Sequence, residues 1–436
     1  MKLPASSSVL VIATGLVVAC SPLCGWQDKE TDKLKIRALR DYARQGSETI
    51  PKITPYFQDI NVEVRREAVK AVVQIGTQRS LEPLAEVCSN NDAEVQIRAT
   101  DGLVNFYLPG YVDHGISATL RRAGDIVAGK WTDRNDEAID PDTPIRPEIS
   151  EALARLVSGG SSMDSRANAA RALGILRDRA SVPALTSALR SKDSRLMYES
   201  LVALQKIRDR SAGPSVVFLV RDLDEKVQLA AIETAGILGP REAIPQLKRV
   251  LENSGNKKVK RAAVVALGQI PDASNHSLFV GLLRDKDEEV RAGAAEGLGR
   301  LAIPEDRPVL EKAWEEEGKT SPRLSQAFAL SMLGETDTGS LKPLGFLVNN
   351  LNQRAWRNVA LPFLSELCLK PAHRQAIVGS IQASSTQDEK TGIAQALSRC
   401  KSADAIPALE KLTKDEDPAV SREALRGLRI LRASIQ

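Results

Sequence analysis

The strongest constraint on the fold of this chain is a short pattern of residues that recurs along it. The stretch EEVRAGAAEGLGRL at residues 288–301 closely resembles KKVKRAAVVALGQI at residues 257–270. With Val290 as position 0, the pattern has a small residue at +4, small or apolar residues at +7 and +8, and an apolar residue at +11. Further copies begin at Val64, Val95, Ser165, Leu196, Val227, Val259, Pro322, Trp356, Glu389 and Val420. Successive copies start 31 to 34 residues apart, except between Val95 and Ser165. The chain is therefore an array of repeats rather than a set of unrelated domains.

Each repeat is predicted to form two helices joined by a tight turn. Apolar residues at 0, +4, +7, +8 and +11 lie on one face of a helix with 3.6 residues per turn. Helix N-caps are expected at residues that precede the copies, namely Asp92, Asp193, Asp287 and Asp417. Left-handed helix ends are expected at the glycines of position +12, namely Gly76, Gly239 and Gly334. First-turn prolines of a second helix are expected at position +18, namely Pro183, Pro214, Pro245, Pro308 and Pro407.

A pair of helices this short cannot bury its own apolar face, so neighbouring pairs are expected to stack. Glycine stands at +9, inside the first helix, in four copies: Gly174, Gly236, Gly268 and Gly299. Glycine in a helix interior costs roughly 0.5 to 1 kcal/mol relative to alanine. Its repeated use at one position predicts a close contact between adjacent helices.

The repeat motifs resemble those of a known family. The segments VRREAVKAVVQIG, VKRAAVVALGQI, VRAGAAEGLGRL and VSREALRGLRIL, with second helices such as AIPALEKL, are similar to short HEAT-like repeats of the phycobilisome-lyase type. The resemblance covers residues 32–436, in about twelve to thirteen units. It implies an all-α fold, a right-handed α/α superhelix whose concave face, made of second helices, is open to a ligand.

The family resemblance implies several activities. Members include bilin lyases, iron-dependent deoxyhypusine hydroxylases with paired His-Glu motifs, and noncatalytic scaffolds. The chain has three histidines, His114, His276 and His373, and none begins a His-Glu pair. It also lacks a glycine-rich phosphate loop, an HExxH motif and a GxSxG motif. No catalytic residue, cofactor or metal site is therefore expected, and a lyase acting on a chromophore-bearing protein is the alternative.

Composition and cysteine spacing argue against two kinds of ligand, nucleic acid and zinc. The formal net charge is only +4 and aromatic residues make up 4% of the chain, so nucleic acid is not an expected partner. Cys88, Cys368 and Cys400 lack the CxxC spacing of a zinc site. Cys368 and Cys400 stand where other copies have apolar residues, which predicts small core side chains.

The N-terminus is typical of an export signal. Lys2 precedes an apolar run of about eleven residues, too short to span a bilayer. The following LVVAC resembles the lipobox of bacterial lipoproteins, which implies a signal peptide over 1–19 and a lipid on Cys20, followed by a tether over 20–31. Soluble export to the periplasm and an uncleaved membrane-tethered segment are the alternatives.

An irregular insertion at residues 108–147 interrupts the regular spacing of the repeats. Tyr107, Tyr111 and Trp131 gather aromatic side chains there that the rest of the chain lacks, and long loops of this kind often bind partners. The alternative is a degenerate repeat whose aromatic residues fill a packing gap. The acidic residues Asp133, Asp136, Glu137, Asp140 and Asp142 lack the spacing of a calcium loop and are expected to be solvated.

The last copy is expected to cap the array, with Arg426, Arg429 and Arg432 forming a solvated outer face. Together these features predict a monomeric, noncatalytic scaffold in a bacterial cell envelope. It would be attached to the membrane only through a lipid anchor, or be periplasmic, and would bind a protein or peptide along its concave face.

Overall fold

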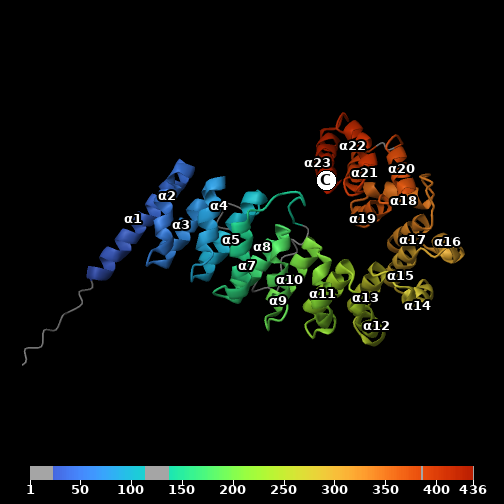
Figure 1. The fold of residues 1–436 in the computed structure, drawn as a ribbon, viewed down its shortest axis with the longest axis horizontal. Coiled ribbons are helices and arrows are strands. Elements are labelled where there is room, and N and C mark those ends of the chain that lie inside the picture. The colour runs from blue at the N-terminus through green and yellow to red at the C-terminus, as the bar shows by residue number, and fades with distance from the viewer. Residues whose placement is uncertain (1–22, 113–136, 384–385, 436) are drawn as a thin grey trace, which may run out of the picture.

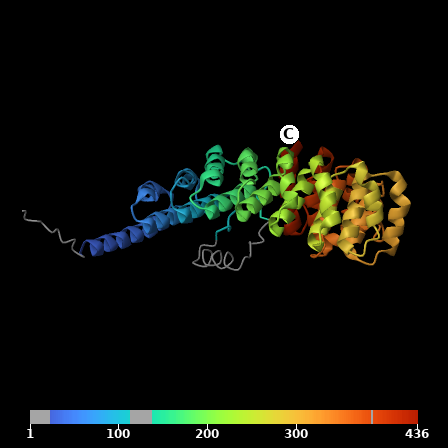
Figure 2. The ribbon, with the colours of Figure 1, turned by 90° about the horizontal axis from the view of Figure 1, so that it is seen from below.

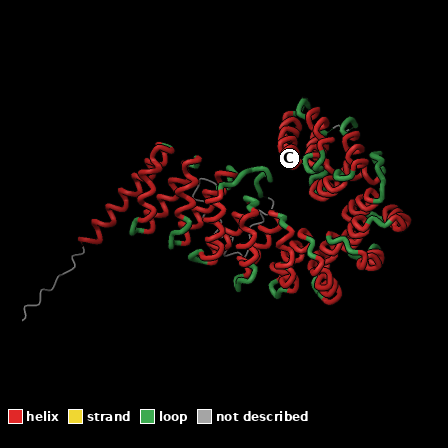
Figure 3. Tube along the Cα trace, in the orientation of Figure 1, coloured by secondary structure: helices red, strands yellow, loops and turns green. Residues whose placement is uncertain are grey.

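The repeats form a continuous stack of helices. The computed structural model describes residues 23–112, 137–383 and 386–435, and these contain helices and turns but no strand (Figure 3). The all-α solenoid expected from the repeat pattern is therefore confirmed. Buried Leu, Val, Ile and Ala side chains run along the stack from Leu39 to Leu431.

One set of helices corresponds to the first half of each repeat. It consists of α1 (Leu23–Gln45), α3 (Val62–Ile75), α5 (Ala93–Tyr107), α8 (Met163–Ile175), α10 (Ser194–Ile207), α11 (Glu225–Leu238), α13 (Lys257–Gln269), α15 (Glu288–Leu301), α17 (Thr320–Met332), α19 (Arg357–Leu367), α21 (Gln387–Leu397) and α23 (Pro418–Ile435). Most of the second set is shorter. It consists of α2 (Ile50–Ile53), α4 (Leu81–Val87), α7 (Pro147–Gly159), α9 (Val182–Ala188), α12 (Ile244–Asn253), α14 (His276–Leu282), α16 (Arg307–Glu316), α18 (Pro343–Asn349), α20 (Pro371–Ser380) and α22 (Ile406–Leu412).

The helix ends follow the expected chemistry. The carboxylate of Asp92 accepts a hydrogen bond from Val95 N at 3.0 Å, and that of Asp193 accepts one from Leu196 N at 2.8 Å. Gly76 and Gly239 end their helices with positive φ angles of 58° and 71°. These residues satisfy backbone groups that the helix itself leaves without partners.

One repeat departs from the expected pattern. Pro214 does not open an α-helix but lies inside the 3-10 helix η5 (Arg210–Ser215), which is followed by η6 (Val217–Arg221). Gly213 precedes Pro214, and Val216 and Val217 follow it. Glycine and β-branched residues have low helix propensity, so this segment forms only short turns.

The stack bends into an arc from about α8 onward, and the N-terminal repeats extend away from it (Figures 1 and 2). Along the bend, α12, α14 and α16 lie on the outer edge while α13, α15 and α17 line the inner edge (Figure 1). The expectation that second helices form the concave face is therefore wrong for this part of the arc. The first helices line it instead.

The glycines at +9 give the physical reason for this direction of bending. A Cβ atom at Gly174 would lie 2.6 Å from Ala203 Cα, and one at Gly299 would lie 2.7 Å from Ala329 Cα. Adjacent first helices are thus in backbone contact, as the sequence pattern predicts. Because these helices approach closely, their side of the stack is shorter, and the stack curves toward it.

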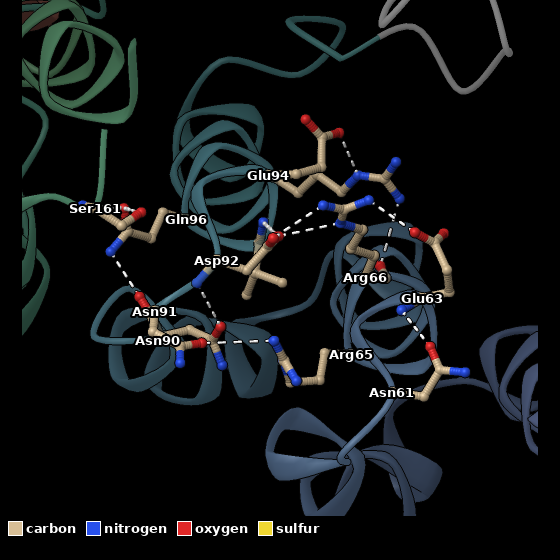
Figure 4. A network of polar contacts seen from close by, with 12 residues as sticks. Asn61, Glu63, Arg65, Arg66, Asn90, Asn91, Asp92, Glu94, Gln96 and Ser161 are labelled. Carbon is tan, nitrogen blue, oxygen red and sulfur yellow. Dashed lines mark hydrogen bonds and ion pairs between the residues drawn. The ribbon is translucent and has the colours of Figure 1, made fainter. Parts of the chain in front are cut away.

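Polar contacts also join neighbouring repeats, and Figure 4 shows one such network around Arg66 and Asp92. Arg66 of α3 binds Asp92, the N-cap of α5, with an Nη2–Oδ2 distance of 2.9 Å. Arg261 occupies the same position of its repeat and binds the next N-cap, Asp287, at 2.9 Å. Each N-cap carboxylate therefore serves its own helix and the preceding repeat at once.

The N-terminal expectations lie partly outside the described residues. The signal segment 1–19 and Cys20 are outside them. The segment expected as a tether, 20–31, includes the first residues of α1, which begins at Leu23. Among the described helices, none is both long enough and apolar enough to cross a membrane.

Candidate partner-binding surface

The last helix is joined to a segment far away in the sequence. Asp140 and Asp142 lie in the interval between α5 and α7, and their carboxylates accept hydrogen bonds from arginines of α23. Arg426 Nε lies 3.0 Å from Asp140 Oδ1, and Arg429 Nε lies 3.1 Å from Asp142 Oδ2. We call these four residues the clasp. It joins the C-terminal arm of the arc to the arm that contains α8 and α10 (Figure 1).

The segment that carries Asp140 and Asp142 is itself held by the arm that contains α8 and α10, which we call the N-terminal arm. Ile139 N donates to Ile175 O at 3.0 Å, at the end of α8, and Ile139 is buried. Lys206 Nζ of α10 donates to Glu137 O at 3.0 Å. The carboxylates are thus held in place by α8 and α10.

The clasp changes the expectation that the acidic segment is solvated. The side chains of Asp140 and Asp142 are only 16% and 15% exposed, so the expectation of a solvated turn is wrong for these two residues. Arg426 and Arg429 pair with these two carboxylates and shield them from solvent. The hydrogen bond from Arg426 lowers the pKa of Asp140 and so favours its ionised form.

Three more arginines lie beside the clasp. Arg177 follows α8, Arg208 follows α10, and Arg399 follows α21. Burial and the guanidinium groups of Arg208 and Arg399 lower the pKa of Arg177. The surrounding protein, Arg208 and Arg426 lower the pKa of Arg399 in the same way. We call Arg177, Arg208 and Arg399 the arginine cluster. Its side chains come from both arms of the arc, Arg177 and Arg208 from one and Arg399 from the other.

The backbone at two of these arginines is unusual. Arg177 and Arg208 have positive φ angles of 51° and 58°. Both stand at +12 of their repeats, the position that Gly76, Gly239 and Gly334 occupy in others. A left-handed conformation costs a side chain about 1 kcal/mol. The arginine cluster was not predicted from the sequence, although arginine in place of glycine at +12 was a signal that could have pointed to Arg177 and Arg208.

A further group of polar contacts joins the first helices α15, α17 and α19. Arg300 of α15 binds Glu366 of α19, with an Nη2–Oε2 distance of 3.0 Å, and its guanidinium lies over the ring of Phe328 in α17. One side chain therefore spans three successive first helices. Burial raises the pKa of Glu296, which also accepts a hydrogen bond from Arg300 at 3.0 Å.

The aromatic residues expected to bind a partner have mixed positions. Tyr111 is buried, with 8% of its surface exposed, and Tyr107 is half-buried. The ring of Tyr107 meets that of Phe106 edge to face at 5.1 Å between centroids. Trp131 lies outside the described residues. Tyr111 thus offers little surface to a ligand, while a role for Tyr107 and Trp131 stays a prediction.

The described histidines make contacts within the fold. His276 Nε2 lies 2.8 Å from Asp306 Oδ1, and the buried His373 Nε2 lies 2.6 Å from Ser331 O. His114 is outside the described residues. No group of three or more His, Cys, Asp or Glu side chains suited to a metal ion occurs in the described part of the chain.

A separate depression of about 590 Å³ lies between α12 and α14. Leu251, Leu278 and Leu282 are among the residues that line it. The charged residues around it are mixed, namely Lys248, Glu252, Lys257, Lys260, Asp285, Lys286 and Asp287. This depression lies on the outer side of the arc, away from the clasp.

The stacked helix pairs and their concave inner surface define an α-solenoid. The chain belongs to the HEAT-repeat family, whose model matches residues 25–104, 149–233, 215–277 and 244–331, more than half of the sequence. No curated protein matches the sequence.

Solved structures similar to this chain include an engineered protein and a phycocyanin lyase complex. One is an engineered protein with 19% identity and a TM-score of 0.38, which covers 88% of this chain and 98% of its own. The other is the complex of CpcE and CpcF of phycocyanin lyase from Nostoc sp. PCC7120, with 19% identity and a TM-score of 0.36. It covers 59% of this chain and 89% of its own.

Proposed function

We propose that this protein is a noncatalytic scaffold that holds an extended segment of a partner protein along the inner surface of its arc. The observation that carries this proposal is the clasp, which brings the two arms together around a surface built from first helices. Solenoids commonly bind partners along such concave surfaces, because stacking extends the surface over many repeats.

The solvent exposure of the clasp arginines supports reversible binding. Arg426 and Arg429 are 49% and 60% exposed. Ion pairs that reach solvent contribute little to stability, typically 0 to about 1 kcal/mol each. Such a contact holds the arms together in the free protein and separates at low cost when a segment enters.

The scaffold is proposed to act in the envelope of a bacterium, as a monomer, after export and attachment of a lipid to Cys20. The apolar run ahead of Cys20 supports this placement. Labelling cells with a fatty-acid analogue tests it, with Cys20→Ala as the control. Export without label on the wild-type protein would support the soluble alternative.

Site-specific crosslinking tests the binding surface. A photo-reactive amino acid replaces Arg208 on the inner side or Arg249 of α12 on the outer side; both residues are exposed. We expect crosslinks to one partner from position 208 and none from position 249. The same crosslink from both positions, or only from 249, would contradict binding along the inner surface.

A further inference from the structure

We propose that the arginine cluster is an anion-binding site that takes the carboxylates of an acidic segment of the partner protein. This inference rests on the proposed function and adds the chemical class of the segment. Arg177 and Arg208 would contact it from one arm of the arc and Arg399 from the other. The planar guanidinium group of arginine suits carboxylates because it donates two parallel hydrogen bonds.

The first argument is that arginine and lysine occupy positions with a left-handed backbone, a conformation that favours glycine. The non-glycine residues with positive φ in the described chain are Arg177, Arg208, Ala302 and Lys401. Three of the four are cations, and all four stand at +12 of their repeats. Glycine would be more stable at this position, as Gly76 and Gly239 illustrate. Strain that is retained in a structure often marks a functional position.

The second argument is that the cluster holds more positive than negative charge. Arg177, Arg208 and Arg399 form no ion pair with the described residues. Arg177 Nε is buried and lacks a hydrogen-bond partner among them. An unpaired buried donor costs about 1 to 3 kcal/mol, so a ligand that accepts its hydrogen bond would be favoured. The nearby carboxylates Asp140 and Glu423 face Arg426 as well.

The third argument is that an acidic segment of this same chain already binds next to the cluster. Asp140, Pro141 and Asp142 place two carboxylates on Arg426 and Arg429. The segment is held in part by a backbone hydrogen bond from Ile139, without being part of a helix. A partner segment with spaced carboxylates would extend the same mode of contact to the neighbouring arginines.

The site is tested with a fluorescent oligo-aspartate peptide of about ten residues, long enough to reach several arginines. The matched probe is the oligo-asparagine peptide of the same length, which has the same shape without the charge. Anisotropy on the full chain measures binding. We expect oligo-aspartate to bind, with affinity that falls as salt increases, and oligo-asparagine not to bind.

The decisive variant is Arg177→Gly combined with Arg208→Gly. Glycine relieves the left-handed strain, so we expect an unchanged or higher Tm together with an affinity for oligo-aspartate at least about tenfold weaker. Ala302→Gly is the matched control, because it relieves the same strain away from the cluster. It should raise the Tm and leave affinity unchanged. Arg399→Gln should weaken binding from the opposite arm.

Two results would overturn the inference. The first is unchanged affinity in the glycine variant, and a lower Tm in that case would show that the arginines serve the helix ends. The second is displacement of the peptide by inorganic phosphate at millimolar concentration where chloride has no effect, which would indicate a phosphate ligand. In each case, crosslinks from position 208 to a partner would still support the proposed scaffold.

Discussion

Arg426 in the last helix donates hydrogen bonds to Asp140, which lies 286 positions earlier in the chain, with an Nε–Oδ1 distance of 3.0 Å. Repeats in a solenoid ordinarily contact only their neighbours. This pair is an exception, because it joins the two arms of the arc directly. We therefore expect its strength to govern access to the inner surface.

The clasp should open in acid. Arg426 lowers the pKa of Asp140 in the closed form, so the ion pair is fully present above the pKa of a free aspartate, about 3.9. Its contribution is lost as the pH falls through the lowered value. Small-angle X-ray scattering should show a larger radius of gyration at low pH than at pH 7.

Low pH protonates many carboxylates at once, so substitutions are needed to test the clasp alone. Asp140→Asn with Asp142→Asn should open the arc at pH 7, with a change in Tm of only a few degrees. Arg426→Gln with Arg429→Gln removes the same pairs from the opposite arm and should open the arc to the same extent. An equally compact Asn variant would show that the clasp does not hold the arms together.

Close packing of the first helices makes a second prediction. Gly299→Val should destabilise the protein by about 1 to 3 kcal/mol, because its Cβ would meet the Ala329 backbone at 2.7 Å. Gly281→Ala in α14 is the control, since nothing lies within 4 Å of its added Cβ. Chemical denaturation should show little change or a gain of up to about 1 kcal/mol for Gly281→Ala.

A buried ion pair between repeats makes a third prediction. Arg171 Nε of α8 lies 3.1 Å from Glu199 Oε2 of α10, and the side chain of Glu199 is only 3% exposed. Burial opposes the charge of Arg171, but Glu199 raises its pKa. Glu199→Gln should lower the free energy of unfolding by about 3 kcal/mol, because it leaves a buried charge unpaired.

The matched control for this pair is Asp164→Asn. Asp164 pairs with Arg195 between the same two helices, but its side chain is 56% exposed. The expected change is below about 1 kcal/mol. Equal losses for the two variants would show that burial does not set the contribution of these pairs.

The cysteines make a fourth prediction. Cys368 and Cys400 are buried at the ends of α19 and α21. A hydrogen bond from the Cys368 thiol lowers the pKa of Cys400, while contact with Cys400 and burial raise the pKa of Cys368. A disulfide-bonded oxidant should accept two electrons and two protons from the pair, leaving one disulfide between neighbouring repeats.

Mass spectrometry after proteolysis should find the Cys368–Cys400 peptide and leave Cys88 free. Cross-linking a loop of this length should stabilise the protein by about 3 to 4 kcal/mol, less any strain in the folded state. Cys368→Ser should abolish the gain. Preferential pairing of Cys88 would contradict the contact between the other two thiols.

Local features of the fold were predictable from the sequence. Asp92 and Asp193 cap their helices as expected, and Gly174 and Gly299 bring first helices into backbone contact. The failure at Pro214 is also local, because Gly213 and two valines outweigh the proline signal. Cys368 and Cys400 were correctly placed in the core.

The candidate site was not predictable in the same way. Asp140 and Arg426 each have an ordinary sequence context, and nothing within their repeats relates one to the other. The same holds for Arg177 and Arg399, which lie on opposite arms.

The sequence by itself determined the helix pairs, their ends and the contact between neighbouring repeats, because each depends on residues close together or on one repeated position. Only the tertiary structure decided which helices line the inner surface and which side chains meet across the arc. Small rotations between successive repeats add up over the whole stack, and no single repeat encodes their sum.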